Sequence, residues 1–240
     1  MSTGWVVGAD VVVIGGGVIG LLSAYLLAGA GKRVALVDRM AVGGEASWAG
    51  GGIVSPLYPW RYSQAVTALA HWSQDYYPAF GEQLLAHTGI DPEVHVTGLY
   101  WLDLDDQAEA LAWAQREGRP LHEVPVASAY AQVPVLGEGF ERAIYMSGVA
   151  NVRNPRLVKA LRAALQNLPN VTLLEHSPVL RFVRDDARVI GVHTAEGEML
   201  AEQGVVAAGA WSGELLQNLE LSLPVEPVKG QMILFKCAEN

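Results

Sequence analysis

Cysteine and charged side chains are scarce in this sequence. It has one cysteine, Cys237, in 240 residues, and 17% of its residues are charged. A single cysteine cannot close an internal disulfide, which favours a reducing setting, so we expect a cytoplasmic protein. The formal net charge is −9, and because such a surface repels phosphate backbones we expect no nucleic acid among its partners.

Long apolar runs are missing too. No run reaches the roughly 18 residues of a membrane-spanning helix, and the longest candidate, residues 18–30, is interrupted by Gly20 and Gly29. We therefore expect no membrane span, and we expect no signal peptide because the first residues lack a basic start and an apolar core. The histidines are scattered without the spacing of metal ligands, so we expect no metal site.

What the sequence does have is a large apolar fraction, 51%, which is typical of a globular chain with a core. Its most informative stretch is VVVIGGGVIG, residues 11–20. Gly15, Gly17 and Gly20 stand between a predicted strand and a predicted helix, which is the context of a dinucleotide-binding fingerprint. Gly15 permits the tight turn, Gly17 lets a pyrophosphate approach the backbone, and Gly20 lets the helix pack on the strand.

The predicted strand covers residues 10–14 and the predicted helix covers residues 18–30, where Gly31 ends it. A second apolar strand follows over residues 33–38 and ends at Asp38. Both strands are nearly continuous in Val, Ile, Leu and Ala, which is typical of parallel strands covered on both faces. Asp38 stands where an acidic side chain accepts a hydrogen bond from a ribose hydroxyl, and its charge would repel the 2′-phosphate of NADP.

The chain after Asp38 favours FAD over NAD as the dinucleotide. A simple NAD-binding domain returns quickly to its sheet, whereas here a long stretch of helix and mixed strands intervenes. Residues 43–52 are rich in glycine and alanine, so their backbone N–H groups can follow a long ligand. A second glycine turn, Gly209 in VVAAGAWS, follows another predicted strand. We therefore expect FAD, with an NAD-dependent enzyme as an open alternative.

The rest of the chain mixes helices with short strands. We expect helices from residue 64 past residue 85 with a possible break at Pro78, over residues 105–117, and over residues 154–168 with Asn154 as the N-cap. We expect strands over residues 95–103, 171–176, 179–186, 189–197 and 227–237, and a loop-rich region over residues 124–144. The strands at 179–186 and 189–197 are predicted to form a hairpin. Because no closing helix follows the last strand, we expect the chain to be part of a longer protein.

Five stretches together resemble the FAD-dependent amine oxidases of the D-amino-acid oxidase family. They are VVVIGGGVIGLLSAYLLAGAGKRVALVD, GGEASWAGGGIVSP, HSPVLRFVRD, VVAAGAWSG and PVKGQM. Within the family the likeness is closest to the glycine oxidases of the thiamine pathway. The resemblance implies an α/β fold, in which a Rossmann-like FAD-binding domain is interleaved with a mostly antiparallel α+β substrate domain. We place the first at residues 1–60 and 147–222, and the second at residues 61–146 and 223–240.

Carried over by position, the resemblance also implies flavin contacts beside the three fingerprint glycines. These are Val18 and Ile19 at the helix start, Asp38 and Arg39 at the ribose, Ala46 and Ser47 by the pyrophosphate, Gly51, Gly52 and Ile53 by the flavin ring, Val179 by the adenine, and Gly209 at the second glycine turn.

The resemblance further implies the reaction. In this family a small amino acid gives its Cα hydride to flavin N5, oxygen reoxidises the flavin to give hydrogen peroxide, and the imine hydrolyses to a keto acid. The arginine that holds the substrate carboxylate belongs to the family's C-terminal third, so we expect the catalytic residues beyond residue 240. Two alternatives stay open: a dehydrogenase that passes electrons to a quinone or partner, and a flavin-binding module without turnover of its own. The sequence also leaves open whether the chain forms a homo-oligomer.

Aromatic side chains flank the glycine-rich loop. Trp48, Tyr58, Trp60 and Tyr62 either line a channel to the flavin or pack the loop, and packing is the simpler interpretation. Arg61 beside them is a weak candidate for meeting an acidic substrate.

Overall fold

The computed structural model describes residues 5–233 and divides into two compact units. The first unit comprises Met1–Gly51, Leu84–Ile90 and Asn154–Asn240, and the second comprises Gly52–Gln83 and Asp91–Arg153. The assignment of cofactor and substrate domains to residue ranges stays a prediction. Each unit is described by itself below.

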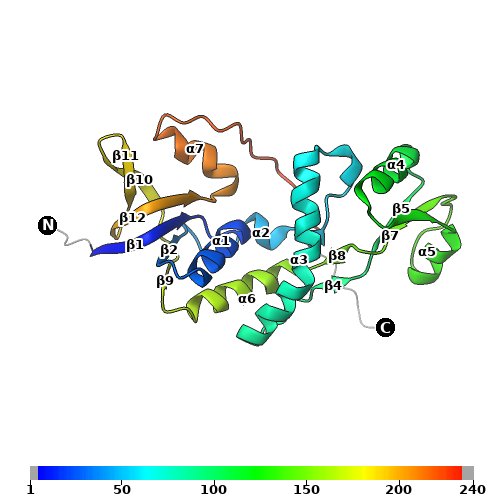
Figure 1. Ribbon diagram of the computed structural model, residues 1–240, viewed down its shortest axis with the longest axis horizontal. Helices are drawn as coiled ribbons and strands as arrows, with labels where there is room; N and C mark the ends of the chain where they lie inside the picture. The colour runs from blue at the N-terminus through cyan, green and yellow to red at the C-terminus, as the bar shows by residue number, and fades with distance from the viewer. Residues whose placement is uncertain (1–4, 234–240) are drawn as a thin grey trace. The chain divides into compact units, whose positions relative to one another are not determined.

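A six-stranded sheet organises the first unit (Figure 1). Its order is β10-β11-β12-β1-β2-β9, with β1 running parallel to both β12 and β2, and β2 parallel to β9. Its strands are β1 (Trp5–Ile14), β2 (Val34–Val37), β9 (Val171–Leu174), β10 (Val179–Asp185), β11 (Arg188–Thr194) and β12 (Gly197–Val206). The predicted hairpin is confirmed, because β10 and β11 pair antiparallel.

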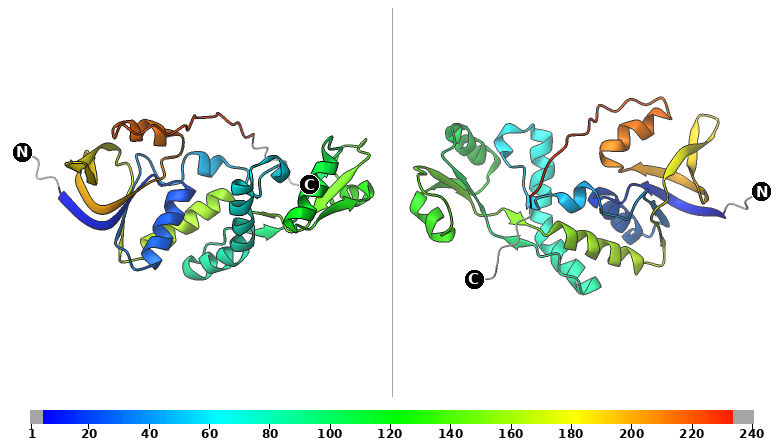
Figure 2. Two further views of the ribbon diagram at one scale, coloured as in Figure 1. Left: turned by 45° about the horizontal axis from the view of Figure 1, so that its top comes forward. Right: turned by 180° about the vertical axis from the view of Figure 1, so that it is seen from behind.

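Helices cover the parallel strands. Helices α1 (Val18–Gly29) and α6 (Asn154–Gln166) lie side by side on one face, as the two views of Figure 2 show. On the other face Val12, Ile14, Ala35 and Val37 form a buried cluster with side chains from β11 and β12, against which Leu215 of α7 (Ser212–Gln217) packs. The predicted βαβ unit and the covering of both faces of its strands are thereby confirmed.

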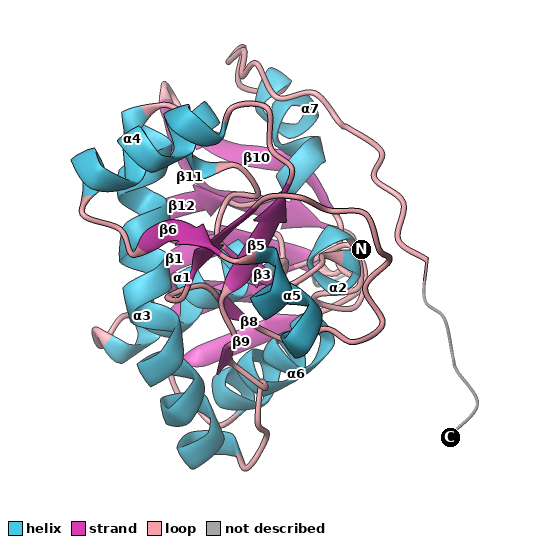
Figure 3. Cartoon of the chain, turned by 90° about the vertical axis from the view of Figure 1, so that its right-hand side faces the viewer, coloured by secondary structure: helices cyan, strands magenta, loops and turns pink. Residues whose placement is uncertain are grey.

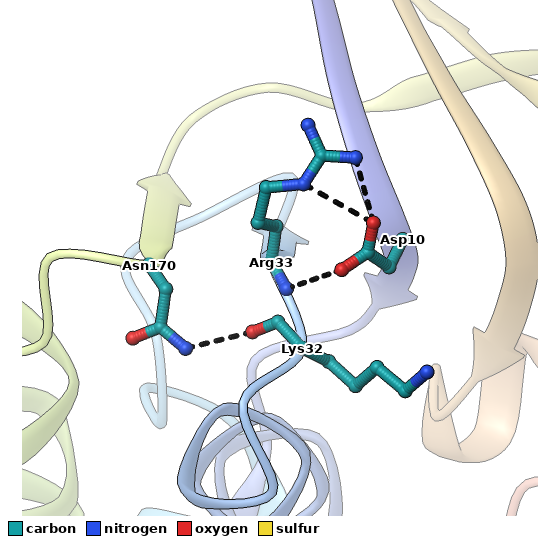
Figure 4. A network of polar contacts seen from close by, with 4 residues as sticks. All are labelled: Asp10, Lys32, Arg33 and Asn170. Carbon is teal, nitrogen blue, oxygen red and sulfur yellow. Dashed lines mark hydrogen bonds and ion pairs between the residues drawn. The ribbon is translucent and has the colours of Figure 1, made fainter.

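A polar network lies at the end of the sheet where β1 begins its pairing with β2 (Figure 4). Asp10 accepts hydrogen bonds from the Arg33 side chain, at 2.7 Å from Nη2 and 3.1 Å from Nε, and from the Arg33 backbone N–H at 2.8 Å. These bonds hold the pKa of Asp10 below its ordinary value. The Asn170 amide donates to the carbonyl oxygens of Ala28 and Lys32 at 2.9 and 2.8 Å. The network ties the end of α1 to β1, β2 and the turn before β9.

Two small antiparallel sheets organise the second unit; Figure 3 draws their strands in magenta together with those of the first unit. One has the order β3-β8-β4, from β3 (Ile53–Val54), β8 (Ala150–Asn151) and β4 (His95–Val96). The other has the order β5-β7-β6, from β5 (Leu99–Leu102), β7 (Ala143–Met146) and β6 (Leu121–Val124). Trp101, Ile144 and Met146 of this second sheet form a buried core with Trp113 of α4 (Gln107–Glu117).

The remaining helical segments are α3 (Gln64–Thr88), α2 (Ala46–Ala49), α5 (Val126–Gln132), η1 (Pro59–Arg61) and η2 (Gly209–Trp211). Helix α3 runs through Pro78 without the predicted break. A proline inside a helix removes one backbone hydrogen bond, and in a helix of 25 residues the other turns hold it together.

Three other expectations were wrong. The strand predicted over residues 95–103 is two strands, because Gly98 adopts a φ of 73° between β4 and β5. The region predicted as loop over residues 124–144 contains α5 and the start of β7. Residues 227–233 form no strand, since a strand needs a neighbour for its backbone hydrogen bonds and no described strand pairs with them. The rest of that predicted strand, with Cys237, lies outside the described residues.

Candidate dinucleotide-binding site

Two glycines, Gly15 and Gly20, allow the close packing at the turn between β1 and α1. Gly15 has a φ of 108°, a conformation that favours glycine. A Cβ on Gly15 would overlap the carbonyl oxygen of Ala207, and a Cβ on Gly20 would overlap the carbonyl oxygen of Gly15. The turn is therefore packed backbone against backbone, and side chains at these two positions would push α1 and the chain after β12 away from β1.

The start of α1 is open to an anion. Gly17, at the N-cap position, has no side chain to cap the helix, and the first N–H groups of a helix have no acceptor within it. The Ser47 hydroxyl, from α2, accepts one of them, the Val18 N–H, at 2.9 Å. The exposed fraction of Ile19 is 65%. The positive end of the helix dipole thus faces accessible space, as a phosphate site requires.

Asp38 is fixed beside this turn. One of its carboxylate oxygens accepts the Gly16 N–H at 2.6 Å, and the other accepts the Met40 N–H at 2.7 Å. A carboxylate has about four acceptor positions, so the group keeps capacity for a ribose hydroxyl while the two backbone bonds hold it in place.

The loop after Asp38 docks on the glycine turn through residues that sequence reasoning missed. The Gly43 N–H donates to the Gly16 carbonyl oxygen at 2.8 Å, and a Cβ on Gly16 would overlap Val42. The Val42 N–H donates to Glu175 at 2.9 Å. Partial burial raises the pKa of Glu175, but this hydrogen bond, one from Arg162 and the nearby charges of Arg162 and His176 outweigh it and lower the pKa overall. Gly16 was visible as the middle glycine of the triplet, whereas nothing local marks Glu175.

The second glycine turn adjoins the first. The Ala207 N–H donates to the Ile14 carbonyl oxygen at 2.8 Å, which continues the pairing of β12 with β1 into the turn. Gly209 follows with a φ of 53°. Two residues later the Trp211 ring lies under the Arg39 guanidinium, whose Cζ is 3.8 Å from the ring centroid. Arg39 also forms an ion pair with Glu45 at 3.3 Å.

The segment before Val179 lies at the same carboxyl end of the parallel strands. The N–H groups of His176 and Ser177 donate to the carbonyl oxygens of Met40 and Asp38 at 3.2 and 2.8 Å. These bonds hold the chain before β10 against the end of β2, and Val179 begins β10 two residues after Ser177.

Most of the residues implied for the cofactor therefore meet at the carboxyl edge of the parallel strands. This group comprises Gly15, Gly17, Val18, Ile19, Gly20, Asp38, Arg39, Ala46, Ser47, Val179 and Gly209. Gly51 follows α2 in the first unit, and a Cβ added there would meet nothing within 4 Å. Gly52 and Ile53 belong to the second unit, where the Gly52 carbonyl oxygen accepts the Val152 N–H at 2.8 Å and Ile53 lies in β3.

The aromatic residues near residue 60 are part of the second unit's packing. Tyr58 and Trp60 pack against its core, and the Trp60 Nε1–H donates to Asp106 at 2.7 Å. Arg61 donates to the same carboxylate from Nε at 2.7 Å and from Nη2 at 3.0 Å. These three donors lower the pKa of Asp106 to about 2. Arg61 is thus already paired with an internal acid, while Trp48 and Tyr62 are exposed.

Residues 5–233 contain no cluster of three or more histidine, cysteine, aspartate or glutamate side chains suited to hold a metal ion. Among these residues no helix has both the length and the apolar character needed to cross a membrane.

A comparison with known protein families identifies the class of dinucleotide-binding protein to which this chain belongs. The model of the DAO family, FAD dependent oxidoreductase, matches residues 10–240. The chain belongs to this family of FAD-dependent oxidoreductases. The expected resemblance is confirmed, and the family's cofactor is FAD.

Relatives of this FAD-dependent oxidoreductase include glycine oxidases. The chain is 68% identical over 231 residues to a glycine oxidase from Pseudomonas putida, and 30% identical over 234 residues to one from Bacillus subtilis. These matches cover 96% and 93% of the chain, but only 63% and 60% of the two relatives. The crystal structure of glycine oxidase from Geobacillus kaustophilus has a TM-score of 0.81 and 30% identity, covering 90% of the chain and 59% of that structure. The α/β fold is confirmed by this likeness.

The residues present fit the diphosphate end of FAD. Gly17 leaves the approach to the first turn of α1 without a side chain, and the Ser47 hydroxyl that caps Val18 still has its own proton to donate. Asp38 stands at the end of β2 with spare acceptor capacity. A cradle of backbone donors, a hydroxyl and one fixed carboxylate is the donor set that a pyrophosphate and a ribose require.

Proposed function

We propose that the protein oxidises glycine or another small amino acid to its imine, with FAD as cofactor and oxygen as electron acceptor. The observation that supports this most is the combination of the glycine turn, fixed Asp38 and 68% identity to a glycine oxidase over 231 residues. Because the chain spans 63% of that relative, the activity, the amino-acid substrate and the peroxide product are proposals for the whole protein.

When bound, FAD supplies the hydride acceptor and passes the electrons to oxygen. In the proposal this chain's own residues hold its adenosine and pyrophosphate. The Ile19 N–H and the Ser47 hydroxyl, whose oxygen already accepts the Val18 N–H, bind the phosphates. Asp38 accepts a hydrogen bond from the ribose, and Arg39 supplies the positive charge beside it. The residues Gly51, Gly52 and Ile53 are proposed to lie by the flavin ring, with Ala46 beside the pyrophosphate, Val179 by the adenine and Gly209 at the second turn.

The neighbours of Asp38 argue for FAD rather than NADP. The two backbone bonds at 2.6 and 2.7 Å hold the carboxylate in place, and an acidic side chain fixed there repels a 2′-phosphate. FAD has free ribose hydroxyls at this position, and a carboxylate oxygen can accept hydrogen bonds from them.

The experiment is an anaerobic titration of the longest form that the gene encodes, with glycine, sarcosine and D-alanine in turn. The proposal predicts that the flavin absorbance bleaches with at least one of these amines and that oxygen restores it with release of hydrogen peroxide. Bleaching with slow recovery in oxygen but fast recovery with a dye would indicate a dehydrogenase instead. A yellow protein that none of the amines bleaches would contradict the proposal.

A further inference from the structure

An aromatic–cation pair crosses the carboxyl end of β1. In the sheet β1 lies between β12 and β2. Trp211 lies five residues beyond the end of β12, and Arg39 lies two residues beyond the end of β2. Their stacking, at 3.8 Å from Cζ to the ring centroid, therefore joins the two segments on either side of the glycine turn.

Arg39 needs such a support to stay in one place. Its side chain is 45% exposed and that of Glu45 is 52% exposed, and an exposed ion pair by itself holds two long side chains weakly. An arginine on an indole face has a second attachment, because its planar guanidinium stacks on the ring. Glu45 immediately precedes α2, which carries Ser47. The guanidinium is thus held between the second glycine turn and the loop that caps α1.

We propose that Trp211 is a positioning residue for the cofactor, which holds the Arg39 guanidinium beside the adenosine and pyrophosphate half of FAD. Trp211 acts through Arg39 and needs no contact with the ligand. The inference rests on the proposed function, namely that the ligand of this edge is FAD and that its adenosine and pyrophosphate half lies beside Arg39.

The test is a double-mutant cycle of Trp211→Leu and Arg39→Met, in which the dissociation constants of FAD and of ADP are measured. ADP contains the adenosine and both phosphates but no flavin. We expect Trp211→Leu to weaken both ligands by about two- to fivefold, the range of an exposed cation–π contact. Trp211→Phe keeps an aromatic face and should stay within twofold of the wild type. In the Arg39→Met background Trp211→Leu should have no further effect, because the group that it positions is gone.

Arg33→Met is the matched control. It removes the same charge from the opposite edge of the sheet, where Arg33 pairs with Asp10 (Figure 4). We expect ligand binding within twofold of the wild type for this variant, which separates a local effect of Arg39 from a change in net charge. Circular dichroism of each variant confirms that the fold is kept.

Two results would overturn the inference. One is unchanged binding of FAD and ADP by Trp211→Leu, and the other is a Trp211→Leu loss that is equally large with and without Arg39. The cycle measures only ligand binding. If none of the amines bleached the flavin, the proposed oxidation would be contradicted, but the cycle would still decide the role of Trp211. If the wild type binds ADP and not FAD, the proposed function fails and the ADP cycle still decides the role of Trp211.

Discussion

At the scale of single residues, the Ser47 hydroxyl holds the first turn of α1, where we propose that the pyrophosphate of the cofactor binds. It accepts the Val18 N–H at 2.9 Å and so replaces the missing cap at Gly17. Ser47→Ala should lower the free energy of unfolding by about 1 kcal/mol, as loss of a helix cap does, and should weaken FAD binding. Urea denaturation of the flavin-free protein measures the first effect. Ser47→Thr, which keeps the hydroxyl, should behave as the wild type, and equal stability of the alanine variant would contradict the assigned contact.

A second residue-scale prediction concerns acid stability. Hydrogen bonds from Arg61 and Trp60 lower the pKa of Asp106 from 3.8 to about 2. The folded protein therefore binds this proton less readily than the unfolded chain, so the carboxylate stabilises the fold fully above about pH 4 and loses this effect as the pH falls through 2.

Asp106→Asn should accordingly melt below the wild type at pH 7, and the difference in melting temperature should shrink between pH 4 and pH 2. Asp105→Asn is the control, since Asp105 is the exposed neighbouring acid. A difference between Asp106→Asn and wild type that stays constant over this pH range would contradict the expected coupling.

At the scale of elements, the packing of α1 on β1 depends on one glycine. A Cβ on Gly20 would overlap the carbonyl oxygen of Gly15, whereas Gly29 in the same helix has open space around it. Gly20→Ala should destabilise the protein by about 1–3 kcal/mol, the usual effect of overpacking. Gly29→Ala should stabilise it by about 0.5–1 kcal/mol through helix propensity. Thermal melts of the two variants should thus shift in opposite directions, and equal shifts would contradict the close packing at Gly20.

The sequence predicts an element well when neighbouring residues determine it, and poorly when contacts with residues distant in the sequence determine it. The strand, glycine turn, helix and second strand up to Asp38 follow from contiguous apolar runs and glycine spacing, and all were confirmed. The split at Gly98 could not be predicted, because a Cβ there would overlap the ring of Tyr145, which is distant in the sequence. The contacts of Val42 with Glu175 and of Arg39 with Trp211 likewise depend on the sheet that brings them together.

At the scale of the whole molecule, the two units should respond differently to the cofactor. A ligand that binds only the folded state at 100 times its dissociation constant stabilises that state by about 2.7 kcal/mol. The contacts proposed for adenosine and pyrophosphate lie in the first unit. We therefore expect FAD to slow amide hydrogen exchange in α1 and in residues 38–47. The β5-β7-β6 sheet of the second unit is the internal reference, and stronger protection there than in α1 would contradict this placement.

The most direct measurement is the identity of the dinucleotide that the purified protein carries. The longest form that the gene encodes would be purified and its absorbance spectrum recorded, and the cofactor would be released by acid and identified by its mass. We expect a flavin spectrum and release of FAD, because we assign the β1–α1 turn, Ser47 and Asp38 to its pyrophosphate and ribose. A colourless protein that takes up no FAD when it is added, or one that releases NAD, would contradict the binding of FAD at this turn.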